Sequence, residues 1–166
     1  RGCAQDRCPE AEQAVLGSML IDPDCIKDVM DKLRPEDFYL RANRDIFETI
    51  YHMFVYSRPI DGVTVAGEME KTGVYNDNTR DYLLQLMDVT PTSANVMEYV
   101  QIVLDKSLMR QVASAAGSIS AMVLDGAGDA GAMLEAAEQK VYAIRRGRSA
   151  QNMVPVSMVL EDVMAH

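Results

Sequence analysis

The chain has 166 residues, of which 48% are hydrophobic and 25% charged, and this balance fits one ordinary globular domain or two small ones rather than a disordered chain. Its formal net charge of −9 repels a phosphate backbone, which argues against strong sequence-independent DNA binding by the chain itself. No apolar run approaches the roughly 20 residues that a bilayer requires and no signal-peptide core is visible, so we expect no membrane association.

Five short amphipathic helices are predicted in the first half of the chain. Strong helix formers dominate the composition, which includes 12 methionines and few aromatic residues. The expected helices run from Pro9 to Ile21, from Ile26 to Leu33, from an N-cap at Asn43 to Arg58, from Asp61 or Thr64 to a stop at Gly73, and around Tyr82 to Met87. None is long enough to be stable alone in water. We therefore expect a packed helical head over residues 9–93, after a loose N-terminus at residues 1–8.

An antiparallel helical hairpin is predicted over residues 94–146. A helix capped by Ser93 or Asn95 meets no strong breaker before the glycine-rich turn at residues 126–131. Apolar residues on both sides of this turn follow heptad spacing, and the seam candidates are Val112, Ile119, Val123, Leu134 and Val141. The alternative for some of these residues is a contact inside the hairpin only. The other apolar positions that need cover are Val100, Leu104, Leu108 and Met122. A second copy of the hairpin is the natural cover, which predicts a dimer.

The C-terminal end is predicted to be a linker at residues 147–153 followed by a short amphipathic helix at residues 154–166. Its apolar stripe is Val156, Val159, Leu160 and Val163. Because such a helix has no core of its own, we expect it to dock in a groove elsewhere. The alternative is that it folds back onto the head.

No catalytic constellation is visible in the sequence. The phosphate-binding loop GxxxxGK[ST] is missing, as are the common hydrolase and zinc-protease motifs. Cys3, Cys8 and Cys25 do not make a disulfide framework, and the pair Cys3 and Cys8 lacks a second pair that would complete a zinc site. We therefore expect no catalytic, cofactor or metal residues in this chain, and a reducing, cytoplasmic location.

Several segments carry a resemblance to a known family. EAEQAVLGSML at residues 10–20 resembles the opening helix of bacterial DnaB-type replicative DNA helicases. Further similarities follow in order: PEDFY at 35–39, RDIF at 44–47, PIDGVT at 59–64, YL at 82–83, PTSAN at 91–95, IV at 102–103, LMR at 108–110 and AEQKV at 137–141. Each motif is weak alone, but their shared order from Glu10 to Ile144 is strong. Asn43 departs from the family, which often has histidine there.

The resemblance implies an assembly role. In this family the N-terminal domains pair through their hairpins into a trimer of dimers, a collar above the hexameric ATPase ring. The C-terminal helicase-binding domain of primase docks on that collar, and Glu10, Tyr82 and Ile119 match the contact region. The linker helix packs on the motor domain of the neighbouring subunit. The motor domain, which is missing here, handles ATP, Mg²⁺ and DNA, and a helicase loader is a further expected partner.

Two alternatives to this interpretation stay open at the sequence level. The chain could be a stand-alone helical adaptor or regulatory protein that ends near His166. It could also belong to a nucleotide-dependent enzyme whose catalytic residues lie elsewhere. Because the chain does not begin with methionine, we expect it to be a piece of a longer protein.

Overall fold

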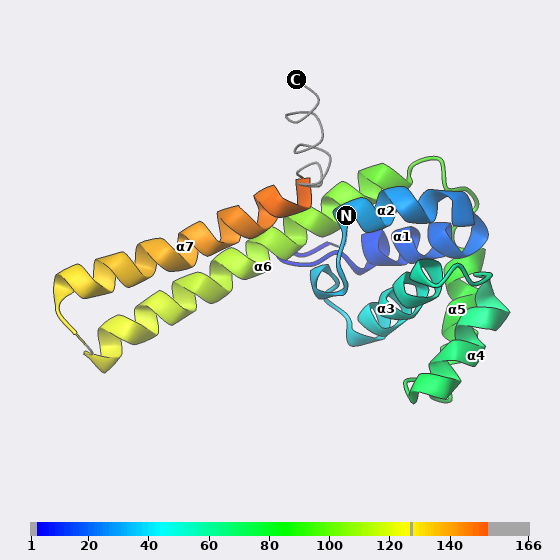
Figure 1. Ribbon diagram of the computed structural model, residues 1–166, viewed down its shortest axis with the longest axis horizontal. Coiled ribbons are helices and arrows are strands. Elements are labelled where there is room, and N and C mark those ends of the chain that lie inside the picture. Colours follow the sequence, from blue (N-terminus) through cyan, green and yellow to red (C-terminus); the bar gives the residue numbers. More distant parts are fainter. Residues whose placement is uncertain (1–2, 127, 153–166) are drawn as a thin grey trace, which may run out of the picture. The chain divides into compact units, whose positions relative to one another are not determined.

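The computed structural model describes residues 3–126 and 128–152. Among these residues all regular secondary structure is helical, and there is no strand (Figure 1). This confirms the predicted all-α class. The chain divides into two compact units, Arg1–Arg110 and Gln111–His166. Within the described residues, no helix is both long and apolar enough to cross a membrane.

The first unit contains the five predicted helices. They are α1 (Pro9–Ile21), α2 (Ile26–Lys32), α3 (Arg41–Val55), α4 (Gly62–Thr72) and α5 (Thr79–Asp88), with short 3₁₀ turns at Pro23–Cys25 and Pro35–Asp37. The predicted ends of α4 are both present. Asp61 caps its N-terminus in a reciprocal pair with Thr64, and Gly73 ends it with a φ of 79°, a conformation that glycine adopts without strain.

The sixth helix, α6 (Val96–Asp125), begins in the first unit and continues into the second. Val100, Val103 and Leu104 are buried in the same apolar core as α1, α3 and α5. The sequence assigned Val100 and Leu104 to the hairpin and expected a second copy to cover them. Their own head covers them instead, so the boundary between head and hairpin lies after Arg110 rather than at residue 93.

Polar contacts hold α6 on the turn before α3. The Ser107 hydroxyl donates a hydrogen bond to Oδ1 of Asp37 at 2.8 Å, and Arg110 donates to the backbone oxygen of the same residue at 2.8 Å. The other carboxylate oxygen of Asp37 accepts the backbone N–H of Arg34 at 2.7 Å. Because the Asp37 side chain is buried, the two bonds to its carboxylate offset the cost of removing that group from water.

The N-terminal segment is less loose than the sequence suggested. Lys106 donates hydrogen bonds to the backbone oxygens of Ala4 and Gln5, at 2.7 and 3.3 Å, and Arg110 donates to that of Asp6 at 2.7 Å. Cys8, which ends the segment, is buried in the core. A periodicity argument finds no helix or strand in residues 3–8, but these contacts with α6 order the segment without either.

One close helix crossing brings α1 against α5. Gly17 is buried, and a Cβ atom built there would clash with Oγ1 of Thr90 and the backbone oxygen of Leu86. Only a residue without a side chain allows the two backbones to approach so closely. The glycine therefore sets the distance between α1 and the C-terminal end of α5.

In the second unit, the rest of α6 and α7 (Ala130–Asn152) are joined by a glycine-containing turn, with Gly126 and Gly128 at positive φ (Figure 1). The predicted linker at residues 147–153 is wrong as far as Asn152, because α7 continues to that residue. The segment is polar, but polarity does not stop a helix, and the single glycine costs only about 1 kcal/mol. The predicted linker helix, with Val156, Val159, Leu160 and Val163, lies outside the described residues.

Candidate protein-interaction site

The three candidates for a partner interface do not all lie in one unit. Glu10 is exposed in the first turn of α1, and Tyr82 is half-buried in α5, both in the first unit. Ile119 is half-buried in the part of α6 that belongs to the second unit. Their joint role in binding a partner stays a prediction.

Tyr82 is tied to a buried polar network. Its hydroxyl donates a hydrogen bond to Oδ1 of Asn43 at 2.5 Å, and the amide of Asn43 donates to the carboxylate of Glu12 at 2.8 Å. That carboxylate also accepts the backbone N–H groups of Tyr39, at 2.6 Å, and Leu40, at 3.4 Å. Glu12 thus places an anion before the first turn of α3, where the helix dipole favours negative charge.

Burial, above all, raises the pKa of Tyr82 above its usual value of 10.0, and the negative charge of Glu12 adds to the effect. Hydrogen bonds with Gln13 and Asn43 oppose this shift. The hydroxyl is therefore neutral at physiological pH and available as a donor to Asn43. The side chain packs against the core but is only partly buried, so its ring can serve a second, external contact.

The sequence prediction for Asn43 is wrong. Asn43 is not the N-cap of α3, because the helix begins at Arg41 and Asn43 is buried inside it. A signal for its partner was available in α1. Glu12 stands three, four and seven residues before the apolar core residues Val15, Leu16 and Met19, so a carboxylate had to be accommodated on the buried face.

A second arrangement missed by the sequence is an apolar groove between α4 and α5, with a volume of about 650 Å³. Its floor and walls include Ala66, Leu83 and Met87, and Asp61, Glu70 and Arg80 are the charged residues among its lining. The signal available in the sequence was that Val63 and Leu84 are apolar but lie outside the apolar stripes of their helices, and the structure exposes both side chains.

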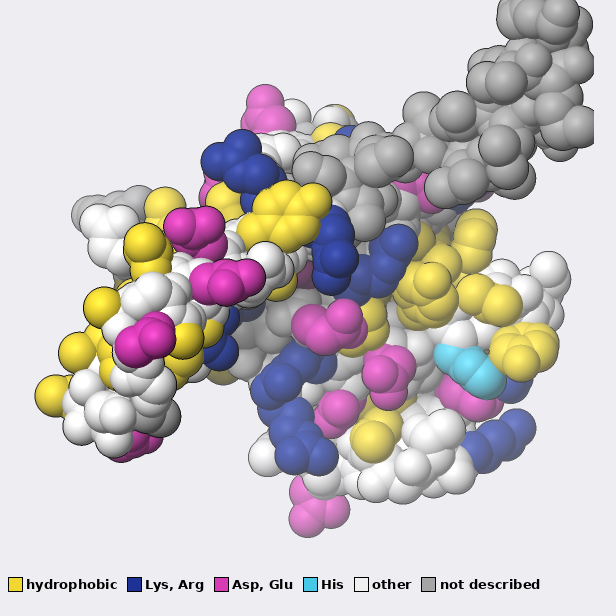
Figure 2. All heavy atoms as spheres, turned by 60° about the vertical axis from the view of Figure 1, so that its left-hand side comes forward, with side chains coloured by type: hydrophobic (Ala, Val, Ile, Leu, Met, Phe, Trp, Pro, Cys, Tyr) yellow, Lys and Arg dark blue, Asp and Glu magenta, His cyan; other side chains and the backbone are white. Residues whose placement is uncertain are grey.

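The seam candidates of the predicted hairpin differ in how deeply they are buried. Ile119 is half-buried, as are Met122, Ala136, Ala137 and Ile144, so the hairpin closes along these positions. The other four seam candidates are exposed: Val112 by 53%, Val123 by 59%, Leu134 by 63% and Val141 by 55%. Figure 2, in which the turn end of the hairpin comes forward, shows hydrophobic side chains on its surface among polar and acidic ones. We call the four exposed side chains of Val112, Val123, Leu134 and Val141 the outer apolar face.

The comparisons with known proteins agree with this architecture. The family described as "DnaB-like helicase N terminal domain" matches residues 5–105. The chain is 33% identical over 157 residues to the replicative DNA helicase DnaB of Mycobacterium leprae, an alignment that covers 93% of this chain and 26% of that protein. It is 34% identical over 136 residues to the DnaB of Geobacillus stearothermophilus, covering 81% of this chain and 30% of that protein. The chain thus spans about a third of the length of these relatives or less.

Solved structures show the same fold. The crystal structure of the N-terminal domain of DnaB helicase from Mycobacterium tuberculosis has a TM-score of 0.77 and 32% sequence identity, and the match covers 84% of this chain and 99% of that one. The N-terminal domain of DnaB helicase from Helicobacter pylori, described with its interactions with primase, has a TM-score of 0.61 at 24% identity over 68% of this chain and 89% of that one.

Proposed function

Because this chain belongs to the DnaB-like helicase N-terminal domain family, we propose that it is the assembly and primase-docking domain of a hexameric replicative DNA helicase that unwinds duplex DNA at the replication fork. Family membership favours this function over a stand-alone adaptor. In this proposal the parent protein works in the cytoplasm. Its motor domain binds ATP, Mg²⁺ and DNA, and the present chain supplies no catalytic group.

The observation that carries the assembly role is the outer apolar face of the hairpin. Val112, Val123, Leu134 and Val141 recur at heptad positions, yet each exposes more than half of its side chain. Burying such a side chain contributes roughly 1.5–3 kcal/mol before ordering costs. A second copy of the hairpin presents the same heptad pattern, so an isologous contact covers both faces at once. Three such dimers would form the hexamer.

Sedimentation equilibrium of the 166-residue chain tests this role. The wild type is expected to form dimers or larger assemblies at micromolar concentrations. Leu134→Asp places an unpaired charge in the contact and should shift the chain toward monomer without loss of helix content. Gln139→Asp, an exposed position on the same helix but off the apolar face, is the matched control and should assemble like the wild type. A wild-type chain that stays strictly monomeric at high micromolar concentration would contradict the assembly role.

Primase docking is the second part of the proposal, and its candidate residues are Glu10, Tyr82 and Ile119. The support for it is the family, together with the exposed carboxylate of Glu10 and the half-exposed ring of Tyr82. The proposed partner is the C-terminal helicase-binding domain of primase. For the stripe of Val156, Val159, Leu160 and Val163 we propose the motor domain of the neighbouring subunit as the docking surface, and a helicase loader as a further partner of the ring.

A further inference from the structure

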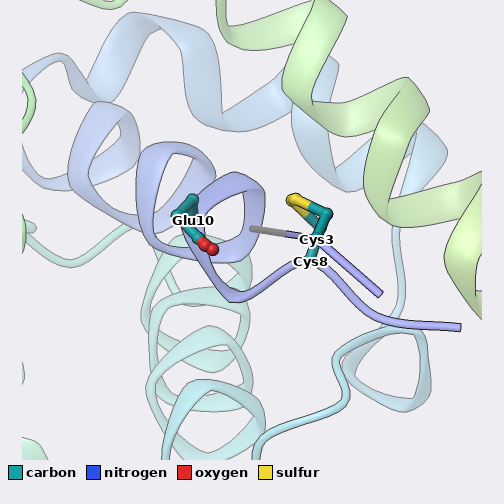
Figure 3. A group of neighbouring side chains, drawn as sticks. All are labelled: Cys3, Cys8 and Glu10. Atoms are coloured by element: carbon teal, nitrogen blue, oxygen red, sulfur yellow. A yellow bond between two sulfur atoms is a disulfide. The ribbon is translucent and has the colours of Figure 1, made fainter. Parts of the chain in front are cut away.

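Three donor groups converge where the N-terminal segment meets α1. The sulfur atoms of Cys3 and Cys8 and a carboxylate oxygen of Glu10 all lie within 4.8 Å of one another (Figure 3). Cys3 and Cys8 are joined as a disulfide, with their Cα atoms 4.5 Å apart. Cys3 and Glu10 are exposed and Cys8 is buried, so the group is anchored on one side and open to solvent on the other.

The backbone that carries these groups is held by contacts other than the disulfide. Lys106 and Arg110 on α6 bind the backbone oxygens of Ala4, Gln5 and Asp6. The backbone oxygen of Cys8 accepts the N–H groups of Ala11 and Glu12, at 3.1 and 3.2 Å, as part of the first turn of α1. The two cysteines should therefore stay close together when the bond between them is reduced.

The ligand types of this group also suit a metal ion. Cys8 is the N-cap residue of α1, and its side chain makes no capping hydrogen bond. Two thiolates and a carboxylate are a ligand set that suits a thiophilic divalent cation in tetrahedral coordination with a water molecule.

We propose that the reduced form of this site binds a thiophilic divalent cation such as Zn²⁺ through Cys3, Cys8 and Glu10, with water as the fourth ligand. A thiol or phosphine reductant supplies the two electrons that open the disulfide, and two protons complete the thiols. Binding of the cation then releases these two protons as two metal–sulfur bonds and one metal–oxygen bond form. The sequence suggested no metal site because no second cysteine or histidine pair follows. The carboxylate and the water take the place of that pair.

The test is a Co²⁺ titration of the full chain, reduced with a phosphine and kept free of oxygen. We expect thiolate-to-cobalt charge-transfer bands and tetrahedral d–d bands that saturate at one equivalent and disappear when Zn²⁺ is added. Cys3→Ser and Cys8→Ser should each abolish the charge-transfer bands. Glu10→Gln should weaken Co²⁺ binding by at least about tenfold, the loss typical even of groups that only support a ligand.

The matched controls are Cys25→Ala and Glu48→Gln, a thiol and a carboxylate that lie outside the group and should leave the bands unchanged. Cobalt bands that are missing from the reduced wild type, or that survive both serine substitutions, would overturn the proposal. Equal rates of alkylation of the reduced Cys3 and Cys8 with and without Zn²⁺ would also overturn it. That result would mean that the cation does not protect the two thiols and that the pair forms a disulfide only. These measurements do not depend on assembly or primase binding.

Discussion

Gly17 shows how a single residue can set the packing of the head. Its missing side chain allows α1 to contact the backbone of Leu86 and the hydroxyl of Thr90. We expect Gly17→Ala to destabilise the chain by about 1–3 kcal/mol, because the obstruction includes backbone that does not move aside easily. Gly67→Ala is the matched control, since a Cβ there meets nothing within 4 Å. At this exposed position of α4, the alanine should stabilise the chain by about 0.5–1 kcal/mol. Urea denaturation measures both, and equal effects would contradict the packing argument.

A second prediction at this scale concerns Cys25. Burial, and then the negative charge of Asp22, raise the pKa of its thiol from 9.0 to about 11. The pKa of the Cys25 thiol is higher in the folded than in the unfolded chain, so the folded state favours the protonated thiol. The contribution of this thiol to the free energy of unfolding is therefore fully present below pH 9 and is lost as the pH rises through 11. The free energy of unfolding should fall by about 1–2 kcal/mol more in the wild type than in Cys25→Ala across that window. Parallel pH profiles for the two proteins would show that the thiol does not titrate in this way.

At the scale of the elements, the sequence predicts where the helices lie, but not which parts of the molecule they contact. Periodicity and caps located α1 to α5, because these signals are local. The partner of Asn43 lies 31 residues away and depends on how α1 packs, so no local rule finds it. The same reason explains α6: spacing shows that Val100 and Leu104 are on an apolar face, but not which part of the molecule covers that face.

The boundary within α6 gives a prediction for truncated chains. A chain that ends at Arg110 keeps Val100, Val103 and Leu104 in the core, so it should unfold cooperatively. A chain that ends at Ser93, the boundary suggested by the sequence, loses all three. At roughly 1.5–3 kcal/mol for each side chain, that loss is comparable with the whole stability of a small domain, about 5–15 kcal/mol. Thermal denaturation followed by circular dichroism compares the two truncated chains. A cooperative transition in the chain that ends at Ser93 would place the boundary between head and hairpin before α6.

The surface of the whole molecule suits contacts with proteins better than contacts with DNA. The net charge of −9 repels phosphate groups, and the outer apolar face of the hairpin favours a protein partner. The hydroxyl of Tyr82 is used internally, and its ring is half-exposed. Tyr82→Phe should therefore bind the C-terminal domain of primase like the wild type, while losing about 1 kcal/mol of stability. Tyr82→Ala should weaken binding by about tenfold or more, as expected for an aromatic interface residue.

Isothermal titration calorimetry with the isolated primase domain measures this binding, and circular dichroism checks that each variant is folded. Glu10→Ala belongs in the same series, because Glu10 is the exposed charged candidate on the same unit. If Tyr82→Ala and Glu10→Ala are both folded and both bind like the wild type, the assignment of this surface to primase is wrong.

The way in which α6 holds the N-terminal segment has a consequence for evolution. Lys106 and Arg110 bind main-chain oxygens of Ala4, Gln5 and Asp6, groups that every amino acid possesses. Selection can therefore replace the side chains at these three positions without losing the attachment. The surface beside the first turn of α1 can change its charge and shape from one lineage to another, while the path of the chain beneath it stays the same.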